Sequence, residues 1–135
     1  MKSDLSKLPT VFIASPYTQG DSAANTHFQC KIFNQLLSDR KVLPVAPLWT
    51  HFQHLIYPRS YEDWIEYDQA MLRLYDCCLR LDADLNCPKT QFSYRESKSS
   101  GADAEVATFK KHGKPVFYSI DDLYKWASEG QNNEQ

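Results

Sequence analysis

The chain has 135 residues, of which 42% are hydrophobic, and a net charge of −2. This length favours one domain with a single core, and the balanced charge disfavours a nucleic-acid duplex as partner. No apolar run is long enough to predict a membrane span, and the first residues lack the apolar segment of a secretory signal. The four cysteines form no Cys-x-x-Cys pair, so we expect reduced thiols in a cytoplasmic protein.

The first half of the chain alternates apolar runs with amphipathic segments. Residues 11–14 predict a buried parallel strand, and a loop of turn-forming residues follows it. A helix with apolar residues at helical spacing should begin at Asp21 or Ser22. Residues 42–46 predict a second strand, which Pro44 confines to a short segment or to a sheet edge.

The same alternation continues through the middle of the chain. Ser60 is predicted to cap a helix, because Asp63 stands three residues later in a capping pattern. A third strand is expected at residues 77–81. The polar stretch that follows, residues 84–98, is long for a loop, and loops of that length are usually functional or mobile.

Two further helices and one strand are expected in the remainder. Ser99 or Ser100 should cap a helix that ends before Gly113, with Asp103 as the acid of a capping pattern. Residues 115–118 predict the fourth strand, and the last helix follows a capping serine.

This order of elements predicts an α/β sandwich with a mostly parallel sheet of four to five strands. We assign residues 1–128 to a single domain and expect residues 129–135 to be a disordered tail. Sheets of this kind bind ligands beyond the carboxyl ends of their strands, at a topological switch point. The loop after the first strand and the helix start near Ser99 are therefore the candidate binding corners.

Glu105 lies about one turn inside the predicted helix that starts near Ser99. A helix start rich in Ser and Gly exposes backbone N–H groups, which suit a phosphate or hydroxyl oxygen. A carboxylate between this corner and the apolar face of the helix could attack a bound sugar. The alternative is an acidic residue that only stabilises the helix dipole.

Asp68 is the strongest anomaly in the sequence. It stands four residues after Trp64 and four before Leu72, within the apolar stripe of its helix. Burying an ionised carboxylate costs several kcal/mol unless it is paired or faces a wet cavity. Asp68 could pair with a buried arginine, or the stripe could be rotated so that Asp68 lies at its edge. The functional interpretation places Asp68 in a cleft with Glu105, where two carboxylates can divide the acid and nucleophile roles.

The sequence predicts neither a metal site nor a cofactor. His51 and His54 could lie on one helical face, but no third ligand stands at a convincing spacing. The glycine motifs of ATP-binding and dinucleotide-binding loops and the nucleophile elbow of serine hydrolases are all missing from the sequence.

Taken together, several segments resemble the nucleoside 2-deoxyribosyltransferase superfamily. They are the run VFIASPY at 11–17, Asp68, the Ser-x-Gly-x-x-x-Glu corner at 99–105 and the run GKPV at 113–116. That group includes the transferases, the 2′-deoxynucleoside 5′-monophosphate N-glycosidases and small bacterial and phage proteins, which the chain looks most like. The resemblance implies a flavodoxin-like three-layer fold, a nucleotide or nucleoside as small-molecule partner, and a homo-oligomer.

The resemblance also implies a mechanism for cleavage of the N-glycosidic bond. Glu105 matches the family nucleophile, which attacks C1′ of the deoxyribose and forms a glycosyl-enzyme intermediate. Asp68 matches a carboxylate that helps the base to leave. Water would complete hydrolysis, whereas a second base would make the reaction a deoxyribosyl transfer. The alternative is a non-catalytic nucleotide-binding module, a sensor or sponge, on the same fold.

Six substrate contacts are implied by the resemblance: Phe12, Ser15, Tyr17, His51, Ser99 and Gly101. Ser99 matches a phosphate-binding serine of the monophosphate hydrolases, where the transferases carry an aspartate, and this favours a nucleotide substrate. The chain departs from the hydrolases in residues 16–19, which lack their arginine. Three cations of the long polar stretch could supply that charge or be ordinary solvated surface: Lys89, Arg95 and Lys98.

Overall fold

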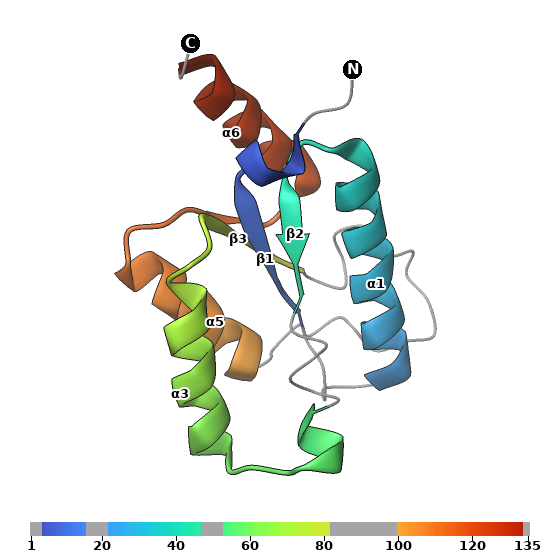
Figure 1. Cartoon of the computed structure of the whole chain (residues 1–135), viewed down its shortest axis with the longest axis vertical. Helices are drawn as coiled ribbons and strands as arrows, with labels where there is room; N and C mark the ends of the chain where they lie inside the picture. Colours follow the sequence, from blue (N-terminus) through green and yellow to red (C-terminus); the bar gives the residue numbers. More distant parts are fainter. Residues whose placement is uncertain (1–3, 16–21, 47–52, 82–99, 134–135) are drawn as a thin grey trace.

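The computed structural model describes residues 4–15, 22–46, 53–81 and 100–133 (Figure 1). The elements in chain order are η1 (Leu5–Lys7), β1 (Thr10–Ala14), α1 (Ser22–Asp39), β2 (Leu43–Val45), α3 (Tyr61–Leu72), β3 (Cys77–Arg80), α5 (Ser100–Lys111), β4 (Val116–Phe117) and α6 (Ile120–Asn133). A helical turn at residues 53–56 precedes α3.

Among the described residues, four strands form one sheet in the order β2-β1-β3-β4. Every neighbouring pair is parallel. This order is that of flavodoxin-like folds, and it confirms the predicted α/β sandwich. Along the chain, β2 is added on one side of β1, and β3 and β4 are added on the other. The switch point therefore lies between β1 and β3, beyond their carboxyl ends.

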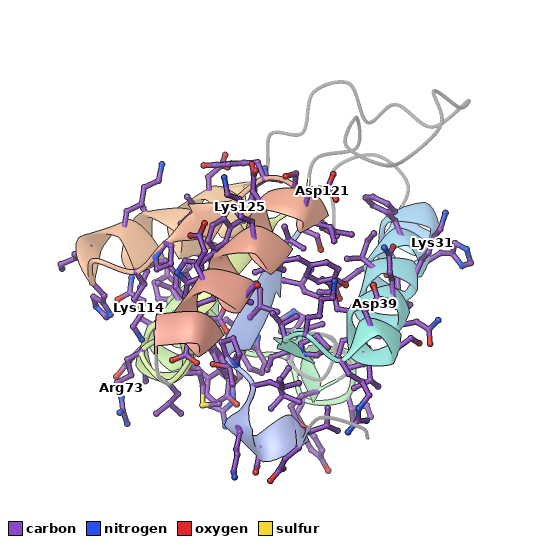
Figure 2. The ribbon with its side chains drawn as sticks, turned by 90° about the horizontal axis from the view of Figure 1, so that it is seen from above. Lys31, Asp39, Arg73, Lys114, Asp121 and Lys125 are labelled. Atoms are coloured by element: carbon purple, nitrogen blue, oxygen red, sulfur yellow. The ribbon has the colours of Figure 1, made fainter. Side chains whose placement is uncertain are left out.

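Helices cover both faces of the sheet. Alternating strand residues point to opposite sides, and each side has its own apolar cluster. On one side, residues of β1 and β3 pack with residues of α1 and α6. On the other side, Phe12 and Cys78 pack with residues of α3 and α5. Figure 2 shows α1, labelled at Lys31 and Asp39, on one side of the sheet and the end of α3, labelled at Arg73, on the other.

Local sequence signals explain the helix ends. The Ser60 Oγ accepts a hydrogen bond of 3.1 Å from the backbone N–H of Asp63, which confirms the predicted cap of α3. The Ser119 Oγ caps α6 in the same way, through the N–H of Asp122 at 3.1 Å. Gly113, with a φ of 71°, lies just beyond the end of α5 in the left-handed conformation that suits glycine.

The second strand and the end of the chain test two boundary predictions. The β2 strand is short, contains Pro44 and lies at the sheet edge, as predicted. The predicted disorder of residues 129–135 is wrong in part, because α6 continues to Asn133. Once buried residues of α6 have anchored its first turns, adding further helical residues costs little.

No helix in the described part of the chain has the length and apolar character that crossing a membrane requires.

Candidate active site

The two carboxylates singled out in the sequence come from facing helices. Asp68 lies on α3, on the same side of the helix as the buried Leu72. Glu105 lies in the second turn of α5. After burial, the negative charge of Asp68 is the next cause that raises the pKa of Glu105. In the same way, burial and then the charge of Glu105 raise the pKa of the Cys78 thiol of β3. The structure therefore brings the predicted pair together above the sheet.

The environment disfavours ionisation of both groups. Burial raises the pKa of Asp68 to about 6. Burial, and then the charge of Asp68, raise the pKa of Glu105 to about 8, while the positive charge of Arg80 acts in the opposite direction. Of the two carboxyl groups, Glu105 is therefore the one that keeps its proton to higher pH.

The two structural alternatives for Asp68 can now be compared with the structure. Asp68 is half-buried between Trp64 and Leu72 in the stripe, so the stripe is not rotated away from it. Arg80 is a buried arginine of the kind predicted as a partner for Asp68, and it forms an ion pair with Asp103. Burial is the cause of the shifted Asp68 pKa.

Arg80 is a site residue that the sequence analysis missed. It is the last residue of β3, opposite Ala14 in the sheet register, and its side chain is only 7% exposed. Its guanidinium donates to the carbonyl of Leu81 and, at 3.2 Å, to the carboxylate of Asp103 in the first turn of α5. The available signal was a cation at the end of an otherwise apolar buried strand.

The contact with Arg80 also changes the interpretation of Asp103. The sequence predicted this acid as the partner of a capping serine. In the structure its carboxylate, 61% exposed, accepts from Arg80 and so joins the start of α5 to the end of β3. The serine side chains of the predicted cap lie outside the described part of the chain, so the cap stays a prediction.

Phe12 and Ser15 occupy different sides of β1. Phe12 is 5% exposed, and its ring lies 5.6 Å from that of Tyr75 and 6.0 Å from that of Phe109. These contacts give Phe12 a place in the core, so the structure does not support it as a direct substrate contact.

Ser15 instead faces α1. Its Oγ accepts a hydrogen bond of 2.6 Å from the Nε2 of Gln29, a buried residue of α1. The Oε1 of Gln29 has no hydrogen-bond partner among the described residues. Ser15 thus lies at the carboxyl end of β1, as expected for a binding corner, but its side chain is on the opposite sheet face from Glu105.

Three predicted contacts, Tyr17, His51 and Ser99, lie outside the described residues. Gly101 belongs to the first turn of α5, so its backbone stands at the end of the helix where N–H groups are exposed. The backbone at this position is compatible with the predicted anion-binding corner.

The structure gives His54 a structural role. Its Nδ1 accepts a hydrogen bond of 2.8 Å from the Trp64 Nε1 and one of 3.2 Å from the backbone N–H of Arg59. These bonds attach the turn at residues 53–56 to α3. Within the described ranges, no three His, Cys, Asp or Glu side chains are grouped so that they could hold a metal ion.

Two surface grooves lie away from the carboxylate pair. A groove of about 670 Å³ runs along α3 and is lined by Trp64, Tyr67 and Arg59, among others. Another, of about 500 Å³, includes Asp76 and Trp126 at the amino edge of the sheet. Neither has Asp68 or Glu105 in its described lining. The chemistry of the coupled carboxylates, rather than the size of a groove, therefore identifies the candidate site.

Comparison of this chain with protein-family models, curated proteins and solved structures gives no match. Its class is therefore stated from its own geometry. It is a parallel α/β sandwich with flavodoxin-like strand order that holds an Asp–Glu pair and a buried arginine on one sheet face.

Proposed function

We propose that this protein cleaves the N-glycosidic bond of a nucleotide or nucleoside, with Glu105 as nucleophile and Asp68 as the group that assists the leaving base. The observation that carries the proposal is the coupling of these two carboxylates, which come from different helices and meet on one sheet face. A pair of interacting carboxylates with different proton affinities is an arrangement that glycosidic bond cleavage commonly uses.

The proposed reaction uses the less populated arrangement of the proton that the pair holds, because the nucleophile Glu105 has a higher pKa than the acid Asp68. In the resting protein this proton lies mainly on Glu105. Its transfer to Asp68 leaves Glu105 as a carboxylate and Asp68 as an acid. Glu105 then bonds to C1′ as the bond to the base breaks, and the Asp68 proton goes to the departing base. Water, or a second base, then attacks C1′, gives its proton to the ionised Asp68 and releases Glu105 as a carboxylate.

The substrate we propose is a 2′-deoxynucleoside 5′-monophosphate. The resemblance at Ser99 favours a phosphate, and the first turn of α5, at Gly101, has the exposed N–H groups that attract one. We place this reaction in the cytoplasm, where the cysteine pattern of the sequence is expected, and in a homo-oligomer, which the resemblance implies.

The test is a product assay with each 2′-deoxynucleoside and its 5′-monophosphate, in the presence and absence of a second base. We expect the wild-type protein to release free base, and the Glu105→Gln variant to lose activity on the order of 10³-fold or more. Glu129→Gln is the matched control, since Glu129 is an exposed residue of α6. Equal activity of the two variants would exclude Glu105 as the nucleophile.

The second candidate, a nucleotide-binding module, is favoured by one observation. A carboxyl group with a pKa of about 8 is mostly protonated near neutral pH, and in that form it donates a hydrogen bond. Glutamine imitates this neutral donor. A binding module would therefore release no base from any substrate and would keep its nucleotide affinity in Glu105→Gln, as measured by calorimetry.

A further inference from the structure

The position of Arg80 relative to the carboxylate pair points to a further role in the proposed reaction. Side chains alternate along β3, so Arg80 points to the same sheet face as Cys78. That face is the one covered by α3 and α5, because Cys78 packs in the cluster of those helices. Arg80 is therefore a cation enclosed on the side of the sheet where Asp68 and Glu105 meet.

The contacts of Arg80 fix it to the start of α5. A buried guanidinium is costly unless its N–H groups are bonded. Arg80 bonds to the carbonyl of Leu81, and its Nη2 lies 3.2 Å from the Asp103 carboxylate. Asp103 stands two residues before Glu105 in the same helix. The ion pair therefore holds the turn that carries Glu105 against the carboxyl end of β3.

The charges around Glu105 come from three elements. Helix α3 contributes Asp68 and Tyr67. Tyr75 follows this helix, and burial, then Tyr67 and Asp68, raise its pKa. Helix α5 contributes Asp103 beside Glu105 itself, and β3 contributes the Cys78 thiol and Arg80. Among these described groups Arg80 is the cation, and its charge favours the ionised form of Glu105.

We propose that Arg80 is a positioning residue that holds the turn carrying Glu105 at the end of β3 and favours the ionised form of Glu105 that acts as the nucleophile. This inference rests on the proposed function for its catalytic meaning, but the charge interaction it describes can be measured without turnover. This charge interaction distinguishes Arg80 from an arginine whose only role is to join α5 to the sheet.

The test is a titration of the side-chain carboxyl carbons by ¹³C NMR, with the Glu105 signal assigned from the spectrum of Glu105→Gln. Arg80→Met keeps an unbranched side chain of similar length and removes the charge. We expect it to raise the titration midpoint of Glu105 by about one pH unit, a tenfold gain in proton affinity. Arg80→Lys keeps the charge and should leave the midpoint nearer that of the wild type.

Asp103→Asn gives the discriminating control, since it breaks the ion pair but leaves Arg80 charged. We expect the Glu105 midpoint to fall, because a negative charge is lost and the charge of Arg80 is less neutralised. A purely structural arginine would make Asp103→Asn shift the midpoint in the same direction as Arg80→Met. That result, or an unchanged midpoint in folded Arg80→Met, would overturn the inference.

Two further outcomes keep the test informative. If Arg80→Met does not fold, the sign of the Asp103→Asn shift decides the question. If no variant releases base but the midpoints move as expected, the charge interaction holds and the proposed function fails. If base is released, Arg80→Met should move the alkaline limb of the kcat/KM profile to higher pH, because Glu105 has the higher pKa of the pair. An unmoved alkaline limb would overturn the role of Arg80 alone.

Discussion

The two faces of the sheet differ in what they bury. Among the described residues, the face covered by α1 and α6 has a cluster of twelve buried residues, and the face covered by α3 and α5 has seven. The smaller cluster shares its face with Asp68, Glu105 and Arg80. Charged groups displace apolar area from a core and lower its contribution to stability. We infer that the α1/α6 face stabilises the fold and that the α3/α5 face holds the site.

The largest effect expected from this difference between the two faces is the loss of activity in Asp68→Asn. We expect base release to fall about 10²- to 10³-fold, because asparagine cannot donate a proton to the leaving base. The folded protein should lose no stability, since a half-buried carboxylate with a raised pKa is removed. Glu66→Gln, an exposed acid of the same helix, is the matched control in a steady-state assay. A similar loss in both variants would contradict the prediction.

A substitution on the opposite face should act on stability alone. Leu123 of α6 is fully buried, so Leu123→Ala should lower the free energy of unfolding by about 2–5 kcal/mol. The difference between the Asp68 and Glu105 titration midpoints should remain. Urea denaturation and carboxyl NMR measure the two quantities. Leu37→Ala, at a residue 38% exposed, should have a much smaller effect. A changed midpoint difference in folded Leu123→Ala would show that the two faces are not independent.

The carboxylate face should also make stability depend on pH. A carboxyl group whose pKa is higher in the folded than in the unfolded protein stabilises less as pH rises between the two values. For Glu105 this interval runs from about 4.5 to about 8. We expect the free energy of unfolding to fall by about 2 kcal/mol across it, after allowance for the solvent that reaches a half-buried group. Asp68 acts in the same direction up to about pH 6.

Urea denaturation at a series of pH values measures this slope. In Glu105→Gln the slope should be clearly reduced, because the group with the larger shift is gone. Stability that rises with pH between about 5 and about 8 in the wild type would contradict the raised Glu105 pKa.

The smallest expected effects are the losses of stability when either of the two helix caps is removed. Ser60→Ala and Ser119→Ala each remove one hydrogen bond to a backbone N–H and should each cost about 1 kcal/mol. Only Ser60→Ala affects the helix that carries Asp68, so we expect it to reduce the rate of base release and Ser119→Ala to leave it unchanged. Thermal denaturation and the product assay check this pair. An equal effect on activity would show that the caps act through general stability.

Much of the fold could be predicted because its signals are local. The apolar run at residues 11–14 can be buried on both sides only in an inner strand, and it lies in β1. Ser60 caps α3 because its hydroxyl reaches an N–H three residues away. Strand order and the extent of α6 to Asn133 could not be predicted in this way, because they depend on packing between distant segments.

The candidate site divides between these two kinds of information. Asp68 could be identified from the sequence alone, since a carboxylate in an apolar stripe breaks the helical period. Glu105 could be placed on its helix but not opposite Asp68. Phe12 was predicted to contact substrate, but its side chain lies in the core, stacked on the ring of Tyr75. The sequence could not show this contact, because it joins segments that are far apart in the chain.

The sequence by itself determined which segments become strands and helices, where two helices begin, and which carboxylate is out of place. These properties follow from side-chain period and from hydrogen bonds across a few residues. Only the tertiary structure decided that burial and the charge of Asp68 raise the pKa of Glu105, and that the charge of Arg80 opposes them. Proton affinity depends on burial and on the charges nearby, and both are set by how α3, α5 and β3 pack.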